Sequence, residues 1–92
     1  MRAELLIDER HALDEGALVE VVVWQVPRPV RGSGHPFKYR LALVRHGVCI
    51  LRYDNETGKG DHRHIGEMQE RYVFTGTDQL LRDFWRDVEA MK

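Results

Sequence analysis

The sequence has one cysteine, no long apolar run and no excess of charge of either sign, and each absence excludes a class of protein. Cys49 stands alone, so no intramolecular disulfide can form and a secreted scaffold stapled by disulfides is excluded. No apolar stretch approaches the roughly 20 residues that a membrane-spanning helix needs. Acidic residues interrupt residues 1–9, which therefore do not resemble a signal peptide, and we expect a cytoplasmic protein with no membrane partner.

The charge balance gives no sign of a protein that coats nucleic acid or a membrane surface. The chain has 14 basic and 15 acidic residues, for a formal net charge of −1. This balance still permits a local basic patch, because opposite charges can be segregated in space. Apolar residues form 42% of the chain and are clustered, so we expect it to fold rather than to stay disordered. Its 92 residues suffice for one domain, which we expect to span residues 1–92.

Short apolar segments separated by turn residues predict an antiparallel sheet. The expected strands cover residues 3–13, 17–26, 37–45, 48–53 and 70–74. Residues 14–16 and the pair His46-Gly47 are typical of hairpin turns. Both faces of residues 17–26 are apolar, which favours a central strand covered on two sides.

A two-residue turn at His46-Gly47 also predicts which residues of the two flanking strands face each other. Counting outward from the turn pairs Leu43 with Ile50, Leu41 with Arg52, Arg40 with Tyr53 and Lys38 with Asn55. A slip of one residue would exchange the two faces of the strand.

Residues 77–92 predict a helix, for which Thr77 is the expected N-cap. Apolar residues recur there at helical spacing, namely Leu80, Leu81, Phe84, Trp85, Val88 and Met91. The face around Phe84 and Trp85 is expected to pack on the sheet. The predicted fold class is therefore α+β, with an antiparallel sheet of about four to five strands and one C-terminal helix packed on one face.

Residues 52–64 are polar out of proportion to the rest of the chain, and we expect the working site in this loop. Residues 54–66 are expected to be irregular. The residue types suit metal-independent cleavage of RNA, which needs a general base, a general acid and cations that hold the phosphate. His62 and His64 would serve as the acid and the base, since histidine changes charge near neutral pH.

Neighbouring side chains would bind the substrate. The cations expected to hold phosphate are Arg40, Arg52 and Lys59. Tyr53 and Asp54 would orient a histidine or a ribose.

Two other readings of this segment stay open. His62 and His64, two residues apart on an extended chain, would reach one metal ion together with His35 or Asp54. No strong metalloprotein motif is present, and we expect no resident metal or cofactor. Alternatively, the segment is a solvated loop whose charges pair among themselves.

The order of the motifs resembles the TumE family. The similar stretches are residues 3–6 (AELL), 16–27 (GALVEVVVWQVP), 38–41 (KYRL) and 52–64 (RYDNETGKGDHRH), with Asp83-Phe84 in the predicted helix. The resemblance covers essentially the whole chain. It implies a toxin of a prokaryotic toxin–antitoxin pair, whose partner is a cognate antitoxin, a small DNA-binding protein encoded beside it.

We therefore expect a toxin that acts on RNA as a ribonuclease, with Asn55 and Arg63 completing the substrate-binding set. The alternatives are a metal-dependent phosphodiesterase and a non-enzymatic module that binds nucleic acid or protein. The antitoxin would dock at a sheet edge and at residues 27–36. An exposed edge strand would also allow a homodimer, although no residue pattern demands one.

Overall fold

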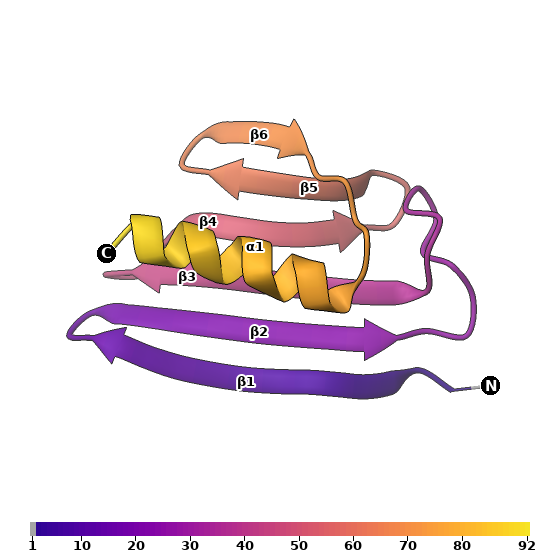
Figure 1. Ribbon diagram of the computed structural model, residues 1–92, viewed down its shortest axis with the longest axis horizontal. Coiled ribbons are helices and arrows are strands. Elements are labelled where there is room, and N and C mark those ends of the chain that lie inside the picture. The colour runs from indigo at the N-terminus through magenta and orange to yellow at the C-terminus, as the bar shows by residue number, and fades with distance from the viewer. Residues whose placement is uncertain (1) are drawn as a thin grey trace.

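The computed structural model describes residues 2–92 as a six-stranded antiparallel sheet with one helix lying across it (Figure 1). The strands are β1 (Glu4–Asp14), β2 (Ala17–Gln25), β3 (Phe37–Arg45), β4 (Val48–Glu56), β5 (Gly60–Ile65) and β6 (Met68–Arg71). Each strand pairs with the next one along the chain. The α+β class and the single C-terminal helix, α1 (Thr77–Ala90), are confirmed. Met1, the first residue of the expected domain, lies outside the described residues.

The predicted count of four to five strands is wrong, because the segment expected to be irregular forms a hairpin. β4 continues to Glu56, and β5 begins at Gly60. The chain reverses between them at Gly58, whose φ of 85° an L side chain would rarely adopt. Since successive side chains of a strand point to opposite faces, the hairpin divides the polar segment between the two faces of the sheet.

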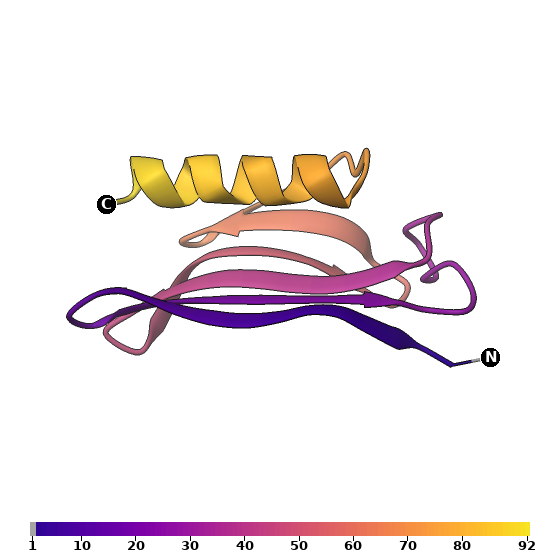
Figure 2. The same cartoon turned by 60° about the horizontal axis from the view of Figure 1, so that its bottom comes forward.

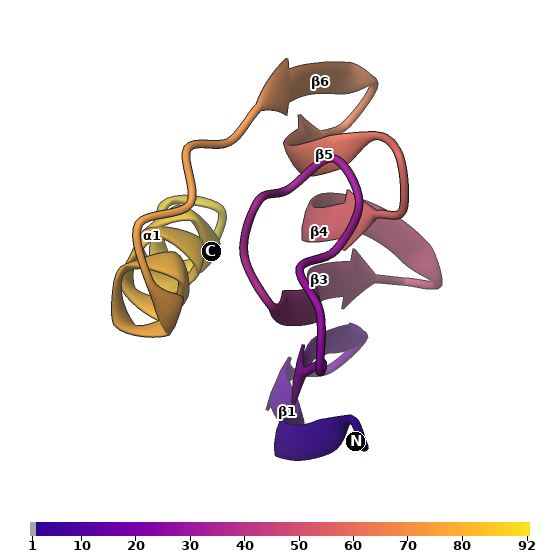
Figure 3. The same ribbon diagram turned by 90° about the vertical axis from the view of Figure 1, so that its right-hand side faces the viewer.

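Helix α1 covers one face of the sheet and leaves the other face open (Figure 2 and Figure 3). Alternate residues of the central strands point toward α1 and are buried with its apolar residues. The buried core consists of Val19, Val21, Val23, Tyr39, Leu41, Leu43, Leu51, Tyr53, Leu80, Phe84 and Val88. Each fully buried side chain of this size contributes about 1.5–3 kcal/mol through apolar burial. Packing against α1 therefore decides which residues face the open side.

Strand β2 is covered on one face only, so the predicted burial of both faces is wrong. Val21 and Val23 are buried on the side of α1. Val22 is partly buried, and Trp24 is 37% exposed on the opposite face. The described part of the chain has one helix, and it lies on a single face of the sheet.

The hairpin between β3 and β4 begins as predicted. Arg45 faces Val48 across the two-residue turn, and Val44 faces Cys49. The φ angles of the turn residues, 50° at His46 and 78° for the following glycine, are both positive, as in a type I′ turn.

One extra residue, Ile50, then shifts the register by a β-bulge. Beyond the bulge the observed pairs are Leu43–Leu51, Ala42–Arg52, Leu41–Tyr53 and Arg40–Asp54, so the predicted pairs are wrong by one residue. The bulge lets Leu51 and Tyr53 occupy buried positions beneath α1. As a consequence, Arg52 faces the open side of the sheet.

The last strand and the start of the helix also differ from the prediction. β6 ends at Arg71 rather than at residue 74, because the chain leaves the sheet there to reach α1 (Figure 1). Tyr72 and Phe74 pack against the core from this connection. Gly76 occupies the N-cap position, so Thr77 is the first helical residue and not the cap. No helix in the described part of the chain is long and apolar enough to cross a membrane.

Residues 26–36 fold back over the end of the β4–β5 hairpin (Figure 3). The backbone N–H of Gly58 donates to the carbonyl of Arg31 over 2.6 Å. Gly32 lies so close to the hairpin that a Cβ added to it would be 2.9 Å from the nitrogen of Gly60. This contact supports the hairpin from the side and fixes the position of its turn.

Candidate functional site

Four of the predicted site residues share the open face of β4 and β5. Arg52 and Asp54 alternate along β4, and His62 and His64 alternate along β5. Strand pairing sets Arg52 opposite His64 and Asp54 opposite His62. Residues directly opposite each other have Cβ atoms about 4.5–5.5 Å apart, so the four side chains form one cluster. A paired hairpin, and not an irregular loop, brings them together.

The guanidinium of Arg52 lies between the carboxylate of Asp54 and the imidazole of His64. Arg52 Nη2 donates to His64 Nε2 over 3.2 Å, and Arg52 Nε lies 3.0 Å from Asp54 Oδ2. The buried Nε–H is not aligned with the carboxylate, so this second contact is an ion pair without a hydrogen bond. Asp54 Oδ1 is 3.7 Å from His64 Nε2. The charge of Arg52 therefore lies between a carboxylate and an imidazole.

The surroundings of His64 favour its neutral imidazole. Burial lowers the pKa of His64, the nearby charge of Arg52 lowers it further, and the opposite effect of Asp54 is smaller. Because Arg52 can only donate, His64 Nε2 must accept, and the proton of the neutral ring resides on Nδ1. The neutral ring is the form that a general base requires.

His62 makes a different contact. Its Nδ1 lies 3.2 Å from the carbonyl oxygen of Gly60, so Nδ1 carries a proton and donates it. No side chain or backbone group among residues 2–92 makes a hydrogen bond with its Nε2. The centroids of the His62 and His64 rings are 6.3 Å apart, with the rings tilted by 55°. Two imidazoles with different partners can serve two different proton transfers.

A hollow of about 160 Å³ opens among these side chains. It is lined by Arg52, Asp54, Glu56, Lys59, His62, His64 and Gln69. This volume is roughly five times that of a water molecule, which leaves room for a phosphate group. Lys59 lies in the turn, with its side chain 71% exposed and its Nζ 3.0 Å from Glu56 Oε2.

Arg40 borders the cluster from the neighbouring strand β3. It faces Asp54 across the strands and is exposed on the open side. Within the described residues its guanidinium makes no ion pair and no side-chain hydrogen bond, so its charge is free to meet a ligand.

Three predicted substrate-binding residues lie on the other face, beneath α1. Tyr53 and Asn55 are fully buried, and Tyr53 donates to Asp87, which together with burial raises the pKa of its hydroxyl. Arg63 Nε donates to Asp87 over 2.7 Å. Asn55 Oδ1 accepts from the backbone N–H of Tyr39 over 2.9 Å. These contacts hold the helix and strands together, and the sheet separates them from the histidine cluster.

Four further residues of the open face were not among the predicted site residues. They are Trp24, Lys38, Gln69 and Arg71. The alternation of Lys38 with Arg40 along one strand already placed both on one face. The positions of Gln69 and Arg71 opposite His64 and His62 depend on the pairing of β6, which the sequence alone did not reveal.

Of the residues considered as metal ligands, Asp54 lies with His62 and His64 on the open face, but His35 does not. His35 lies on the face of α1, where its Nε2 is 2.7 Å from Asp61 Oδ2 and its ring stacks on Phe74 at 3.7 Å. The sheet separates it from His62 and His64, which lie on the open face. In the part of the chain that the structure describes, no three His, Cys, Asp or Glu side chains are arranged to hold a metal ion.

Comparison with known proteins assigns the family. Neither the curated proteins nor the solved structures include a significant match to the chain. A family model described as toxin TumE matches residues 2–92. Because this match extends over the whole sequence except its first residue, the chain belongs to the TumE toxin family.

Proposed function

We propose that this toxin binds RNA on the open face of its sheet and cleaves it by acid–base catalysis without a metal ion. The observation that carries the proposal is the placement of two imidazoles and one guanidinium around a phosphate-sized hollow. His62 and His64 have different hydrogen-bond partners, and Arg52 contacts His64 directly. The hollow lies on the face that α1 leaves open, so a polymer has access to it.

His64 is the proposed general base, since burial and Arg52 lower its pKa and keep it neutral. It removes the proton of a ribose 2′-hydroxyl, and the resulting oxygen attacks the adjacent phosphorus. The bond from phosphorus to the 5′-oxygen breaks, and His62 in its protonated form donates a proton to that leaving oxygen. The products are a 2′,3′-cyclic phosphate and a free 5′-hydroxyl, so no water, oxidant or metal is consumed.

Arg52 and Arg40 are the proposed phosphate ligands. Both present guanidinium groups to the open face, where they would offset the charge that develops on the non-bridging oxygens. A bound phosphate competes with His64 Nε2 for the Arg52 donor. Binding would therefore free that nitrogen for the 2′-hydroxyl. Lys59 would add a point charge from the exposed turn.

A cognate antitoxin is the proposed partner, and the bacterial or archaeal cytoplasm the proposed location. β1 and β6 are the outer strands of the sheet, so each has one edge without a neighbouring strand. Either edge would accept a strand from the antitoxin, or from a second copy of the chain as a homodimer.

The proposal is tested by induced expression in a bacterial host and by incubating purified protein with RNA in excess chelator. We expect growth arrest, relief by the neighbouring antitoxin gene, and cleavage that the chelator does not prevent. His62→Ala and His64→Ala should each lower the cleavage rate about 10²–10⁴-fold. The matched control is His46→Asn, in an exposed turn remote from the cluster, with asparagine chosen because it tolerates the positive φ.

Three results would contradict the proposal in different ways. Cleavage abolished by chelator and restored by a divalent cation would favour a metal-dependent phosphodiesterase. Growth arrest without RNA cleavage would favour a non-enzymatic binding module. Toxicity unchanged in His62→Ala and His64→Ala would remove the catalytic role of the cluster.

A further inference from the structure

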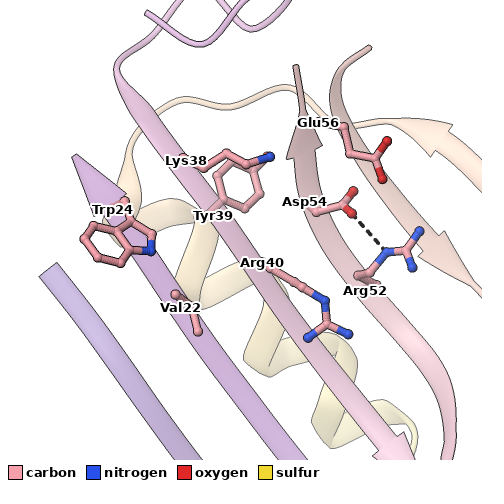
Figure 4. A pocket seen from close by; sticks show the side chains of 8 residues that line it. All are labelled: Val22, Trp24, Lys38, Tyr39, Arg40, Arg52, Asp54 and Glu56. Atoms are coloured by element: carbon pink, nitrogen blue, oxygen red, sulfur yellow. Dashed lines mark ion pairs between the residues drawn. The ribbon is translucent and has the colours of Figure 1, made fainter. Parts of the chain in front are cut away.

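A second and larger hollow lies beside the histidine cluster on the open face (Figure 4). Its volume is about 360 Å³, at the lower end of the range for pockets that hold small organic ligands. Three residues, Arg52, Asp54 and Glu56, line both hollows, so the two lie next to each other on the open face. The far wall of the larger hollow is formed by Trp24 on β2 and Lys38 on β3.

Trp24 differs from the other aromatic residues of the chain. The remaining phenylalanine, tyrosine and tryptophan side chains pack on the side of α1, against the core or against one another. Trp24 alone among them projects from the open face, with 37% of its surface exposed. Trp24 presents a large, partly exposed planar ring beside Lys38 and Arg40, and such a ring is the kind of platform on which nucleobases stack.

The cations around Trp24 complement a nucleotide. Lys38 is its direct cross-strand neighbour, and Arg40 follows two residues later on the same face of β3 (Figure 4). Arg40 makes no ion pair within residues 2–92, so it offers an uncompensated charge to a phosphate. Arg52, at the border of the two hollows, is already held by its contacts with Asp54 and His64.

We propose that the larger hollow is a nucleobase subsite, in which an unpaired base of the RNA stacks on Trp24. This inference rests on the proposed function and specifies its substrate class as single-stranded RNA. The phosphate next to the stacked base would contact Arg40, and the chain would continue across β4 to the histidines on β5. Three strand spacings of about 4.8 Å separate β2 from β5, so the substrate must be longer than one nucleotide.

Selectivity against duplexes follows from the same geometry. The faces of bases inside a double helix are covered by their neighbours in the stack, and exposing one requires unpairing and unstacking. A hairpin loop or a single-stranded tail presents unstacked bases without that cost. Trp24 therefore favours unpaired segments, whereas the cations alone would bind single and double strands with little distinction.

Binding can be measured separately from cleavage with a 2′-O-methyl oligoribonucleotide, which has no 2′-hydroxyl to attack. In a Trp85→Phe variant, Trp24 is the only tryptophan, and its fluorescence should be quenched on binding. Trp24→Ala should weaken binding about tenfold or more, and Trp24→Phe should retain most of the affinity. Circular dichroism of each variant shows whether it is folded. If Trp24→Ala does not fold, the affinity of Trp24→Phe can still be compared with that of the parent protein.

An abasic scan separates stacking from a general loss of binding. Removing one base from the oligonucleotide should weaken binding to the parent protein at one position, and that loss should disappear in Trp24→Ala. Equal affinity of Trp24→Ala and the parent would overturn the subsite. The subsite would also be overturned if Trp24→Ala lowered the affinity for a single strand and for a duplex equally. Quenching of the Trp24 fluorescence by the antitoxin but not by the oligonucleotide would overturn it as well.

Failure of the nucleobase subsite and failure of the proposed catalytic function give different results. If Trp24 binds the unpaired base but the protein cuts no RNA, the subsite holds and the catalytic proposal fails. If the protein cuts RNA through His62 and His64 while Trp24→Ala leaves KM and kcat unchanged, the catalytic proposal holds and the subsite fails.

Discussion

Arg52 Nη2 donates a hydrogen bond to His64 Nε2 over 3.2 Å on the face of the sheet that the helix leaves open. This single contact links a phosphate-binding candidate to an acid–base candidate. Burial is the main reason that the pKa of His64 is lowered next to the carboxylate of Asp54, and the charge of Arg52 lowers it further.

Replacing Arg52 should raise the pKa of His64. In Arg52→Gln the positive charge that disfavours the imidazolium is removed, whereas burial still lowers the pKa and Asp54 now acts without a competing cation. If His64 is the general base, the acidic limb of the kcat/KM profile should move to higher pH together with the pKa. Titration of the imidazole Cε1–H signal by NMR measures the pKa independently of activity. Arg45→Gln is the control, because Arg45 lies at the end of β3 and pairs with Asp14 at the end of β1, outside the cluster. A lower pKa of His64 in Arg52→Gln would contradict the assigned contact.

Asp87 should matter for stability. It accepts from Arg63 and Tyr53 beneath the helix, so Asp87→Ala leaves two polar groups without their partner. We expect the free energy of unfolding in urea to fall by about 2–3 kcal/mol. Glu89→Ala on the exposed side of the same helix should change it by less than about 0.5 kcal/mol. A loss no larger than that of the control would mean that solvent replaces the lost contacts.

The contribution of Asp87 should also depend on pH. Burial by itself raises the pKa of Asp87, but the hydrogen bonds from Arg63 and Tyr53 outweigh it, and the net shift is downward. A carboxyl whose pKa is lower in the folded state stabilises the fold above its unfolded pKa and loses that contribution as the pH falls. The difference between the parent and Asp87→Ala should therefore shrink below about pH 4. Urea unfolding at several pH values measures it, and a difference that grows on acidification would contradict the sign.

Asn55 and its neighbour Asp54 should have opposite phenotypes. The side chain of Asn55 accepts from Tyr39 N and donates to the carbonyl of Phe37, which continues the pairing of β3 and β4 beyond their last ladder pair. Asn55→Ala should lower the free energy of unfolding by about 2–3 kcal/mol, with RNA binding per folded molecule unchanged. Asp54→Asn on the open face should alter cleavage more than stability. Weaker RNA binding by folded Asn55→Ala would contradict this prediction and would indicate that Asn55 contacts the substrate.

Gly32 and Gly34 provide a matched pair in one loop. Both have positive φ, 93° and 76°, but a Cβ on Gly32 would lie 2.9 Å from Gly60 N, whereas one on Gly34 would meet no atom within 4 Å. Gly34→Ala should lower the free energy of unfolding by about 1 kcal/mol, because only the backbone strain at positive φ is added. Gly32→Ala should cost more and should loosen the β4–β5 hairpin, seen as faster hydrogen exchange at Gly58. Equal effects of the two substitutions would show that the close approach is relieved without consequence.

Local features of the chain were predictable because their causes are local. The helix followed from the spacing of Leu80, Phe84 and Val88, and the turn at His46 from its following glycine. The polar residues and glycines around Gly58 predict a loop, because such residues usually mark loops. Its two halves pair with each other as β4 and β5, and that pairing was not visible in the composition.

The sequence predicted that the histidines at positions 62 and 64 and the cations at positions 40 and 52 surround one phosphate-sized hollow. Their grouping depended on the side of the sheet to which each points. Tyr53, Asn55 and Arg63 looked equally suitable by residue type, yet they point toward α1.

By itself, the sequence determined the residue types of the site, the helix, the first hairpin turn, the turn at His46-Gly47 and the likeness to TumE toxins. Tertiary structure decided which of those residues meet. The extra residue Ile50 shifts β4 by one position, and the burial of Leu51 and Tyr53 under the helix then turns Arg52 toward His64. Because neighbouring strand residues point to opposite faces, one inserted residue and one covering helix were enough to select the members of the site.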